Sequence, residues 1–463
     1  MTSRGDQFSV AGRRVVVVGA ARSGVAAALL LVERGAQVTL TDLRPNLNDA
    51  RDADRLRHSG VELELGGHRP QTLLDASLIV LSPGVPLSQP VLAMARRAAV
   101  PIVGEIELAS RWLRGRIIAI TGTKGKSTTT ALAGRMLDAG GMQTAVGGNI
   151  GVPLSAQVAV SAPDTIHVVE VSSFQLETIQ TFHPWIAVLL NFSPDHLDRH
   201  ATLEGYATAK ARIFENQDDH DWVVINADDP DALALARGAR GRRCQFSANP
   251  SMQEGVVVLS DTIAYRHAGR DEPLVPLSAV KLIGRHLLAD VAAAAAVGKL
   301  SGVSSADMTR AVESFRGLEH VLEFVAEVRG VRFVNDSKAT NVESALGAIE
   351  SFGEGLAVIL GGRYKGGDFG HLREPLASRH ATVIAIGEAR PLVRAALEPA
   401  VPVAEAASMA DAVRQAFARA GPHGAVLLAP ACSSFDMFVD YADRGRAFRR
   451  EVAELEKSLL HEQ

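Results

Sequence analysis

The chain has 463 residues, of which 47% are apolar and 22% charged, and its formal net charge is −4. At about 150 residues per domain, two to four domains are expected, each with its own core. The weak negative charge gives no reason to expect nucleic acid or a membrane as a partner, so anionic ligands need local binding groups. Two distant cysteines and the lack of a long apolar segment predict a cytoplasmic protein, and nothing requires more than a monomer.

The start of the chain predicts a βαβ unit. A strand over 15–18, a glycine-bearing turn and a helix precede a second strand over 37–41. The turn is a degenerate dinucleotide fingerprint, because alanine replaces its second glycine. Asp42 follows the second strand, where an acidic residue can contact a ribose, and Ser82 begins a loop after a strand over 78–81. Nucleotide binding and a purely structural turn both fit these residues.

A phosphate loop is the strongest single signal. The strand over 117–121 leads through the turn 122–125 into a helix. Backbone N–H groups of such a turn and the positive end of the helix cradle polyphosphate, with Lys126 as a point charge and the Ser127 hydroxyl as a Mg²⁺ ligand. The loop is a shortened form, because Ile120 stands where the P-loop pattern has its first glycine. The segment predicts nucleotide binding.

A carboxylate follows in the same unit. Glu170 ends an apolar strand over 166–170, and an acid beside a phosphate loop is where Mg²⁺ must be positioned. Asn149, in a glycine-rich turn, either braces the backbone or reaches a ligand. A metal role for Glu170 is therefore predicted, against the alternative of a solvent-facing strand end.

Two histidines, His196 and His200, are spaced i and i+4 in the next polar loop. The lack of a His-Glu-x-x-His pattern, the absence of a nearby cysteine and a preceding proline argue against zinc. A Mg²⁺ or phosphate neighbourhood fits better. Lys210 lies on the helix predicted over 206–214 and carries no signal by itself.

The last third of the chain, after an alanine-rich helix over 290–300, predicts another α/β unit. Its expected strands are 333–334, 357–360, 381–386 and 425–428. The polar or glycine-rich loops after these strands are 335–341, 361–368, 387–388 and 429–434. Because such loops gather at one edge of a parallel sheet, one functional edge is expected.

The predicted fold is therefore α/β with three domains. Residues 1–104 form a Rossmann-like domain, 105–317 a central P-loop ATPase-like domain with a mostly parallel sheet, and 318–463 a Rossmann-like C-terminal domain. The segment between 227 and 279 gives no clear pattern. Domain closure before chemistry is expected.

Taken together, the motifs resemble the Mur ligase family over about residues 13 to 450. They are Gly-Thr-Lys-Gly-Lys-Ser-Thr (122–128), Gly-Asn-Ile-Gly (148–151), Glu-Val-Ser-Ser-Phe-Gln-Leu-Glu (170–177), Asp-His-Leu-Asp-Arg (195–199), Asn-Asp-Ser-Lys-Ala-Thr-Asn (335–341) and Pro-Ala-Cys-Ser-Ser-Phe-Asp (430–436). The last two are the most specific. The resemblance implies a ligase of peptidoglycan precursor synthesis that binds UDP-substrate, ATP and glutamate with its first, second and third domains.

The reaction implied by the resemblance has two steps. ATP phosphorylates the carboxylate of UDP-N-acetylmuramoyl-L-alanine, and the amine of D-glutamate attacks the acyl phosphate, which releases ADP and phosphate. A carboxylate is a poor electrophile, so phosphate is installed as a leaving group, and Mg²⁺ and lysines offset the gathered negative charge.

The resemblance also implies the site residues. The ATP-binding residues are Gly122, Thr123, Lys124, Gly125, Lys126, Ser127, Thr128 and Asp336. Two Mg²⁺ ions are held by Ser127, Glu170, His196 and Lys210, the last as a CO₂-derived carbamate. Asp42, Arg44, Ser82 and Asn149 contact the UDP-linked substrate, and Thr340, Lys365, Ser434 and Phe435 contact glutamate. Lys126, His196, Lys210 and Lys338 are the implied catalytic residues.

The sequence departs from the family pattern at the adenine end of the ATP site. Where the family usually has His-Asn-x-x-Asn, His286 is followed by Leu287 and Asp290, and where it has His-Arg, Val321 follows a histidine. Lys124 replaces the usual asparagine of the phosphate loop. We expect its charge to offset part of the missing arginine.

Two alternatives stay open. A sibling ligase that adds another amino acid, including L-glutamate, would share most of these motifs. A nucleotide-binding protein without catalysis would explain the altered Leu287, Asp290 and Val321, although every residue assigned to phosphates and metal is present.

Overall fold

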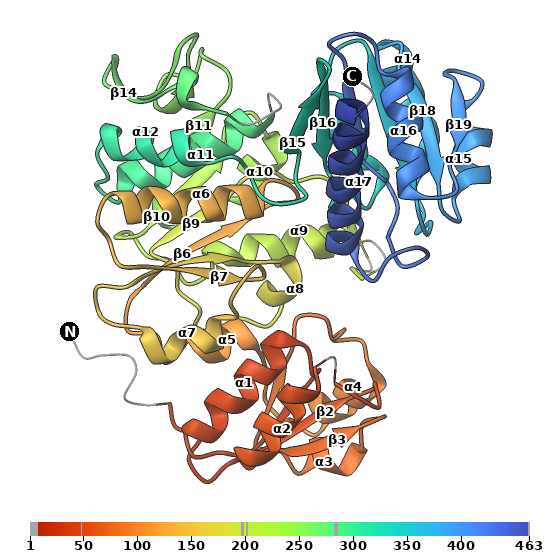
Figure 1. The fold of residues 1–463 in the computed structure, drawn as a ribbon. Coiled ribbons are helices and arrows are strands. Elements are labelled where there is room, and N and C mark those ends of the chain that lie inside the picture. Colours follow the sequence, from red (N-terminus) through yellow and green to blue (C-terminus); the bar gives the residue numbers. More distant parts are fainter. Residues whose placement is uncertain (1–7, 48, 196–198, 201, 282–285, 462–463) are drawn as a thin grey trace. The chain divides into compact units, whose positions relative to one another are not determined.

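The computed structural model describes residues 8–47, 49–195, 199–200, 202–281 and 286–461 (Figure 1). These residues divide into two compact units. The first unit comprises Met1–Ala279 and Ala289–Val312, and the second comprises Val280–Leu288 and Glu313–Gln463. The first unit contains two sheets and the second contains one.

The first sheet is five-stranded and parallel, in the order β3-β2-β1-β4-β5. Its strands are β1 (Arg14–Val18), β2 (Gln37–Asp42), β3 (Glu62–Leu65), β4 (Leu78–Leu81) and β5 (Ile102–Gly104), and its helices are α1 (Arg22–Glu33), α2 (Ala50–His58), α3 (Pro70–Leu74), α4 (Pro90–Arg97) and α5 (Glu105–Ser110). The valines of β1 are buried on both faces, as expected for a parallel sheet covered on both sides. The strand order reverses at β1, so the loops after β1 and β4 lie at the switch point where such sheets bind ligands.

The second sheet has nine strands in the order β14-β13-β12-β11-β10-β9-β6-β8-β7. They are β6 (Arg116–Thr121), β7 (Thr144–Gly148), β8 (Ile166–Glu170), β9 (Ile186–Leu189), β10 (Trp222–Asn226), β11 (Arg242–Ser247), β12 (Gly255–Val258), β13 (Thr262–His267) and β14 (Arg270–Pro276). The pairs from β7 to β12 are parallel, and β12, β13 and β14 pair antiparallel. This antiparallel extension lies in the segment between 227 and 279, which shows no clear sequence pattern. Because β6 lies between β8 and β9, the phosphate loop follows an inner strand.

The helices after β6 connect these strands or follow them. They are α6 (Lys126–Ala139), α7 (Leu154–Gln157), α8 (Ser173–Leu176), α9 (Leu203–Ala211), α10 (Pro230–Leu235), α11 (His286–Leu300) and α12 (Ser305–Ser314). The 3-10 helices of the described chain are η2 (Val158–Val160), η3 (Arg212–Phe214), η4 (Leu277–Ala279) and η5 (Phe369–Leu372).

The second unit has a six-stranded sheet in the order β15-β16-β20-β17-β18-β19, in which only β15 is antiparallel. Its strands are β15 (Glu323–Val328), β16 (Val331–Asn335), β17 (Leu356–Gly361), β18 (Thr382–Ile386), β19 (Val403–Glu405) and β20 (Ala425–Leu428), and its helices are α13 (Val342–Ile349), α14 (Arg373–Ala377), α15 (Arg390–Leu397), α16 (Met409–Arg419) and α17 (Tyr441–His461). Two core clusters contain alternate residues of the inner strands. The strands β16, β20 and β17 are neighbours, so their following loops share one edge of the sheet.

The predicted fold class is confirmed: the chain is α/β, with three mostly parallel sheets. The expected strands occur within one or two residues of their predicted positions. The domain boundaries at residues 104 and 317 stay a prediction. Within the described ranges, no helix has the length and apolar character needed to cross a membrane.

Candidate active site

The phosphate loop, residues 122–125, joins the carboxyl end of β6 to the first turn of α6. Gly125 has φ +80°, in the left-handed region that favours glycine. A Cβ at this position would also clash with the Asp290 carboxylate. The turn therefore requires glycine for two reasons, and α11 supplies a carboxylate directly beside the loop.

Asn191, the second residue after β9, forms hydrogen bonds that connect the phosphate loop to the end of this neighbouring strand. Its Oδ1 accepts hydrogen bonds from the N–H groups of Thr123 (2.9 Å) and Lys124 (2.8 Å), and its Nδ2 donates to the Lys124 carbonyl (3.2 Å). Asn191 was not among the predicted site residues. The available signal was its position just after an inner strand that pairs with β6.

Two of the predicted catalytic lysines converge on one carbonyl of the loop. Lys210 Nζ donates to the Gly122 oxygen at 2.6 Å, and Lys126 Nζ donates to the same oxygen at 3.0 Å and to the Thr123 oxygen at 2.9 Å. Lys210 is only 2% exposed. Burial, and next the nearby Lys126 charge, hold the pKa of Lys210 well below its ordinary value. Both effects favour the uncharged amine over the ammonium.

Glu170, at the end of β8, connects the phosphate loop to the turn after β7. Ser127 Oγ donates to Glu170 Oε2 at 2.6 Å, and Asn149 Nδ2 donates to Glu170 Oε1 at 2.8 Å. The three residues were predicted separately and lie together. A hydroxyl and a carboxylate beside a phosphate loop are oxygen donors of the kind that Mg²⁺ prefers. Thr128 is buried in the first turn of α6, and the predicted His196 lies outside the described residues.

In the first sheet, Asp42 organises the glycine turn after β1. Its Oδ2 accepts from the Ala20 N–H at 2.7 Å, and Arg44 binds both carboxylate oxygens at 2.9 Å. Arg44 is the main reason why the pKa of Asp42 lies well below its usual range. Ser82 is buried against Gly19 of the same turn. The predicted residues Asp42, Arg44 and Ser82 thus surround the switch point. The hydrogen bonds of Asp42 go to Ala20 and Arg44 of the protein.

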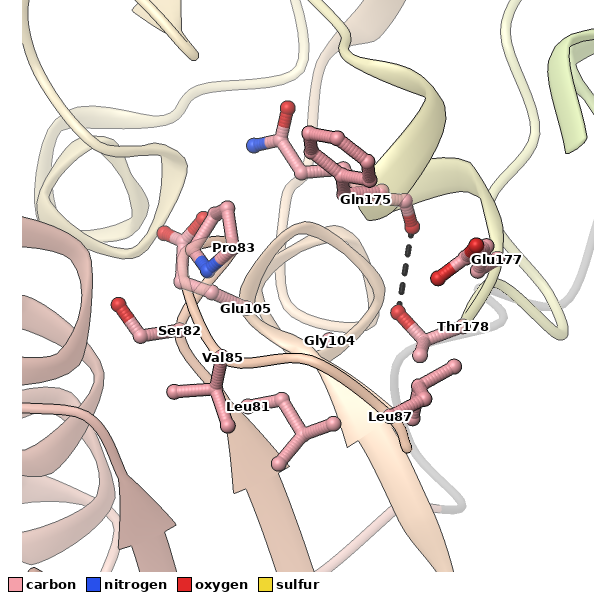
Figure 2. Close-up of a pocket in the computed structure, with 11 residues that line it drawn as sticks. Leu81, Ser82, Pro83, Val85, Leu87, Gly104, Glu105, Gln175, Glu177 and Thr178 are labelled. Atoms are coloured by element: carbon pink, nitrogen blue, oxygen red, sulfur yellow. Dashed lines mark hydrogen bonds between the residues drawn. The ribbon is translucent and has the colours of Figure 1, made fainter. Parts of the chain in front are cut away.

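A pocket opens beside Ser82 (Figure 2). Ser82 and Pro83 line it from the loop after β4, Glu105 from α5, and Gln175 from α8. Glu105 Oε1 accepts from the Ser155 N–H at 2.6 Å, whereas Glu105 Oε2 and Gln175 Nε2 have no hydrogen-bond partner in the described chain. Burial raises the pKa of Glu105 to about 7. Neither residue was predicted as a site residue: Gln175 lies within the motif 170–177 but was not singled out, and Glu105 lies in none of the motifs.

The second unit gathers the remaining predicted residues on the loops after β16, β17 and β20. Asp336 is buried, accepts from the Leu322 N–H at 3.2 Å, and has its pKa raised by burial to about 7. Lys338 and Thr340 continue this loop. The other predicted residues here are Lys365, which is exposed, Ser434, which is buried, and Phe435, which is 62% exposed.

Backbone pairing joins two of these loops. The Arg363 N–H donates to the Ser433 oxygen at 2.9 Å, and the Ser433 N–H donates back at 3.0 Å. The strand order places these loops at one edge of the sheet, as expected, and a functional role of that edge stays a prediction.

Comparison with known proteins finds matches over most of the chain. Residues 13–104 match the family model of the Mur ligase MurD-like N-terminal domain. Residues 120–298 match that of the Mur ligase middle domain, and residues 322–432 match that of the Mur ligase glutamate ligase domain. The UDP-N-acetylmuramoylalanine--D-glutamate ligase of Acidobacterium capsulatum is 47% identical over 440 residues, which cover 95% of each chain. That of Koribacter versatilis is 43% identical and covers 97% of this chain and 100% of its own.

The chain belongs to the Mur ligase family. Solved Mur ligase structures share its fold at low sequence identity. The UDP-N-acetylmuramate-alanine ligase MurC of Thermotoga maritima aligns with a TM-score of 0.61 at 18% identity, over 96% of this chain and 99% of the other. A pseudomurein peptide ligase type C of Methanothermus fervidus aligns with a TM-score of 0.60 at 16% identity, over 96% of this chain and all of the other.

The departures of this Mur ligase from the family pattern have structural counterparts. Leu287 is 5% exposed and belongs to a core cluster of the second unit, so an apolar side chain takes part in packing where the family usually has asparagine. Val321 is half-buried in the turn that precedes β15.

Asp290 is the departure that lies against the phosphate loop, beside Gly125. Burial raises its pKa to about 7, so a large share of the side chain is a neutral carboxylic acid near neutral pH. In that form it offers one donor and one acceptor, as the usual asparagine does. The pKa shift therefore reduces the repulsion that a carboxylate would exert on nucleotide phosphates.

For Lys124 in the phosphate loop, we expect Lys124→Asn to weaken ATP binding by about three- to tenfold, because an exposed charge near the phosphates is lost. Titration calorimetry with ATP measures this effect, and the deficit should shrink in high salt. Lys124→Arg keeps the charge and serves as the control. Equal ATP affinity in the asparagine variant and the unmodified protein would remove the compensating role.

For Gly125, we expect Gly125→Ala to weaken ATP binding by at least about tenfold. The left-handed φ costs about 1–2 kcal/mol for a residue with a Cβ, and the clash with Asp290 displaces the loop. Adding Asp290→Ala should restore part of the affinity by removing the clash alone. Gly141 has φ +77° at the other end of α6 with open space around it, so Gly141→Ala is the matched control. The same ATP affinity in both alanine variants would contradict the clash.

Proposed function

We propose that this Mur ligase joins D-glutamate to UDP-N-acetylmuramoyl-L-alanine in an ATP-dependent reaction that passes through an acyl phosphate. The observation that supports it best is the joining of Ser127, Glu170 and Asn149 by hydrogen bonds beside a phosphate loop that also holds Lys126 and Lys210. The names of the two bacterial relatives give the substrates.

In the first step a carboxylate oxygen of the substrate attacks the γ-phosphorus of ATP, and ADP leaves. The first-turn N–H groups of α6 and the Lys126 ammonium would bind the phosphates, where they offset charge that shifts during transfer. Asn149, already held by Glu170, would orient the muramoyl part. Asp42, Arg44 and Ser82 line the switch point that would receive the uridine diphosphate, and Glu105 and Gln175 offer polar atoms in the adjoining pocket.

In the second step the glutamate amine attacks the acyl carbon, the C–N bond forms, a proton leaves the nitrogen, and phosphate departs with its bridging oxygen. Thr340, Lys365, Ser434 and Phe435 would hold the glutamate carboxylates. Lys338 would lie at the reaction centre and Asp336 at the nucleotide. These assignments follow from the family motif.

The oxygen donors present fit Mg²⁺, which supplies charge neutralisation for the phosphates when bound. Ser127 and Glu170 would hold one ion, and His196 and carbamylated Lys210 a second. The lowered pKa of Lys210 supports the carbamate, because only a neutral amine adds to CO₂.

The wider setting is also part of the proposal. Domains over 1–104, 105–317 and 318–463 would bind the UDP-substrate, ATP and glutamate, in a monomer that acts in the cytoplasm on peptidoglycan precursors. Neither nucleic acid nor a membrane is a partner in this proposal.

One assay tests the function. Phosphate release from ATP is measured with UDP-N-acetylmuramoyl-L-alanine, separately with D-glutamate and with L-glutamate. Release that requires both the UDP-substrate and D-glutamate is expected. Release with L-glutamate instead would favour the sibling ligase, and ATP binding without release under any condition would favour a non-catalytic nucleotide-binding protein.

A further inference from the structure

Arg444, in the first turn of α17, is a buried cation bound to neutral groups. It is 1% exposed. Its Nε donates to Ser337 Oγ at 3.0 Å, its Nη2 to the Ser337 carbonyl at 2.9 Å, and its Nη1 to the Cys432 carbonyl at 3.1 Å. None of its hydrogen bonds within the described chain goes to a carboxylate.

This guanidinium joins the loops of the proposed glutamate site. Ser337 lies between Asp336 and Lys338 on the loop after β16, and Cys432 begins the segment that leads to Ser434 after β20. The loop after β17 also approaches it, because a Cβ on Gly362 would lie 3.1 Å from Arg444 Nη1. One side chain therefore holds two of these loops together by hydrogen bonds and lies close to the third.

The positive charge of Arg444 is not needed to hold these loops together by hydrogen bonds. Neutral amide donors could hold a hydroxyl and two carbonyls without the desolvation penalty of a buried ion. Burial lowers the pKa of Arg444 to about 10, so it remains protonated at neutral pH. Asp436, the acidic group that acts on it through space, is itself held by the Glu388 N–H at 2.9 Å. Among the described residues Asp436 makes no ion pair with Arg444, so the buried positive charge would also stabilise a second anion bound at these loops.

We propose that Arg444 is a positioning residue that fixes the loops of the amino-acid site and selects, through its buried positive charge, an amino acid with two carboxylates. This inference rests on the proposed function, because it assumes that glutamate enters the second unit. Two effects follow: the bracing sets the turnover, and the charge sets the preference for glutamate over its neutral analogue glutamine.

The test compares kinetics of the full chain with Arg444→Met and Arg444→Lys, using glutamate and glutamine as acceptors. We expect Arg444→Met to raise the KM for glutamate and to lower the glutamate-to-glutamine ratio of kcat/KM by about tenfold, because a unit charge is lost near the site. The KM for ATP should stay within about twofold. Arg444→Lys should keep most of the selectivity while kcat falls, because lysine retains the charge but cannot form the three hydrogen bonds of the guanidinium.

The matched control is Arg446→Met on the same helix, whose exposed side chain pairs with Asp443 at 3.5 Å. It should leave both kinetic constants unchanged. If Arg444→Met does not fold, Arg444→Gln keeps donors without charge and decides the same comparison. An unchanged glutamate-to-glutamine ratio in the folded neutral variant overturns the inference. A lack of turnover with either glutamate enantiomer in the unmodified chain overturns the proposed function instead.

Discussion

Replacing Lys210 with alanine should reduce ATP-dependent amide formation by about 1,000-fold, and small carboxylates such as acetate should restore part of it. Lys210 is buried, and burial holds its pKa well below the ordinary value, which favours the amine form with a free lone pair. The uncharged amine can add to the carbon of CO₂ and lose a proton, which turns a neutral group into an anionic carbamate. Acetate can occupy the space left by the truncated side chain and supply a similar carboxylate. The measurement is phosphate release with and without acetate.

Two further variants separate a carbamate from a simple cation. Lys210→Arg keeps a positive charge but forms no carbamate, so it should be as inactive as the alanine variant. Lys299→Ala, whose side chain pairs with Glu272 at 2.6 Å elsewhere in the first unit, controls for loss of a lysine. Full activity of Lys210→Ala without added carboxylate would reject the carbamate, and so would an active arginine variant.

Replacing Glu170 with glutamine should lower kcat by about 100- to 1,000-fold and raise the Mg²⁺ concentration needed for half-maximal rate. The amide has nearly the shape of the carboxylate, so packing in β8 is retained. It has one acceptor oxygen in place of two, and it cannot accept from both Ser127 and Asn149 as Glu170 does. The loss therefore reports on charge and on hydrogen bonding beside the phosphate loop.

Rates measured across a Mg²⁺ titration check this expectation. Glu215→Gln is the control, because Glu215 pairs with Arg212 outside the phosphate loop. A glutamine variant of Glu170 with the unmodified Mg²⁺ dependence would remove the metal role and leave Glu170 as a structural link between Ser127 and Asn149.

The sequence could predict those parts of the site that follow a strand. The loop after β6 and the carboxylate at the end of β8 belong to neighbouring parallel strands, so proximity of Ser127 and Glu170 follows from the strand order. The same rule placed Asp336 and Ser434 on one edge, since β16 and β20 pair in parallel. Local pattern and chemistry were enough in these cases.

Other contacts depend on chain segments that are distant in sequence. Arg444 lies more than a hundred residues from Ser337, and only packing of α17 brings its guanidinium to that loop. The carboxylate of Asp290 lies beside Gly125 because of the way α11 packs, which no local pattern contains. The strands between residues 255 and 276 pair antiparallel, and each is too short for a repeating pattern of apolar and polar residues to be recognised in the sequence. In each case the sequence around a residue does not show which distant residue it contacts.

The hydrogen bonds of Asn191 have a thermodynamic consequence for the phosphate loop. Because one amide oxygen accepts from two successive N–H groups of the loop, the backbone at Thr123 and Lys124 is already ordered when the chain has folded. The conformational entropy of this turn, worth about 1–2 kcal/mol per residue, is thus lost when the chain folds and not when ATP binds. ATP then meets a receptor with little freedom left to lose, so its affinity reflects contacts more than ordering.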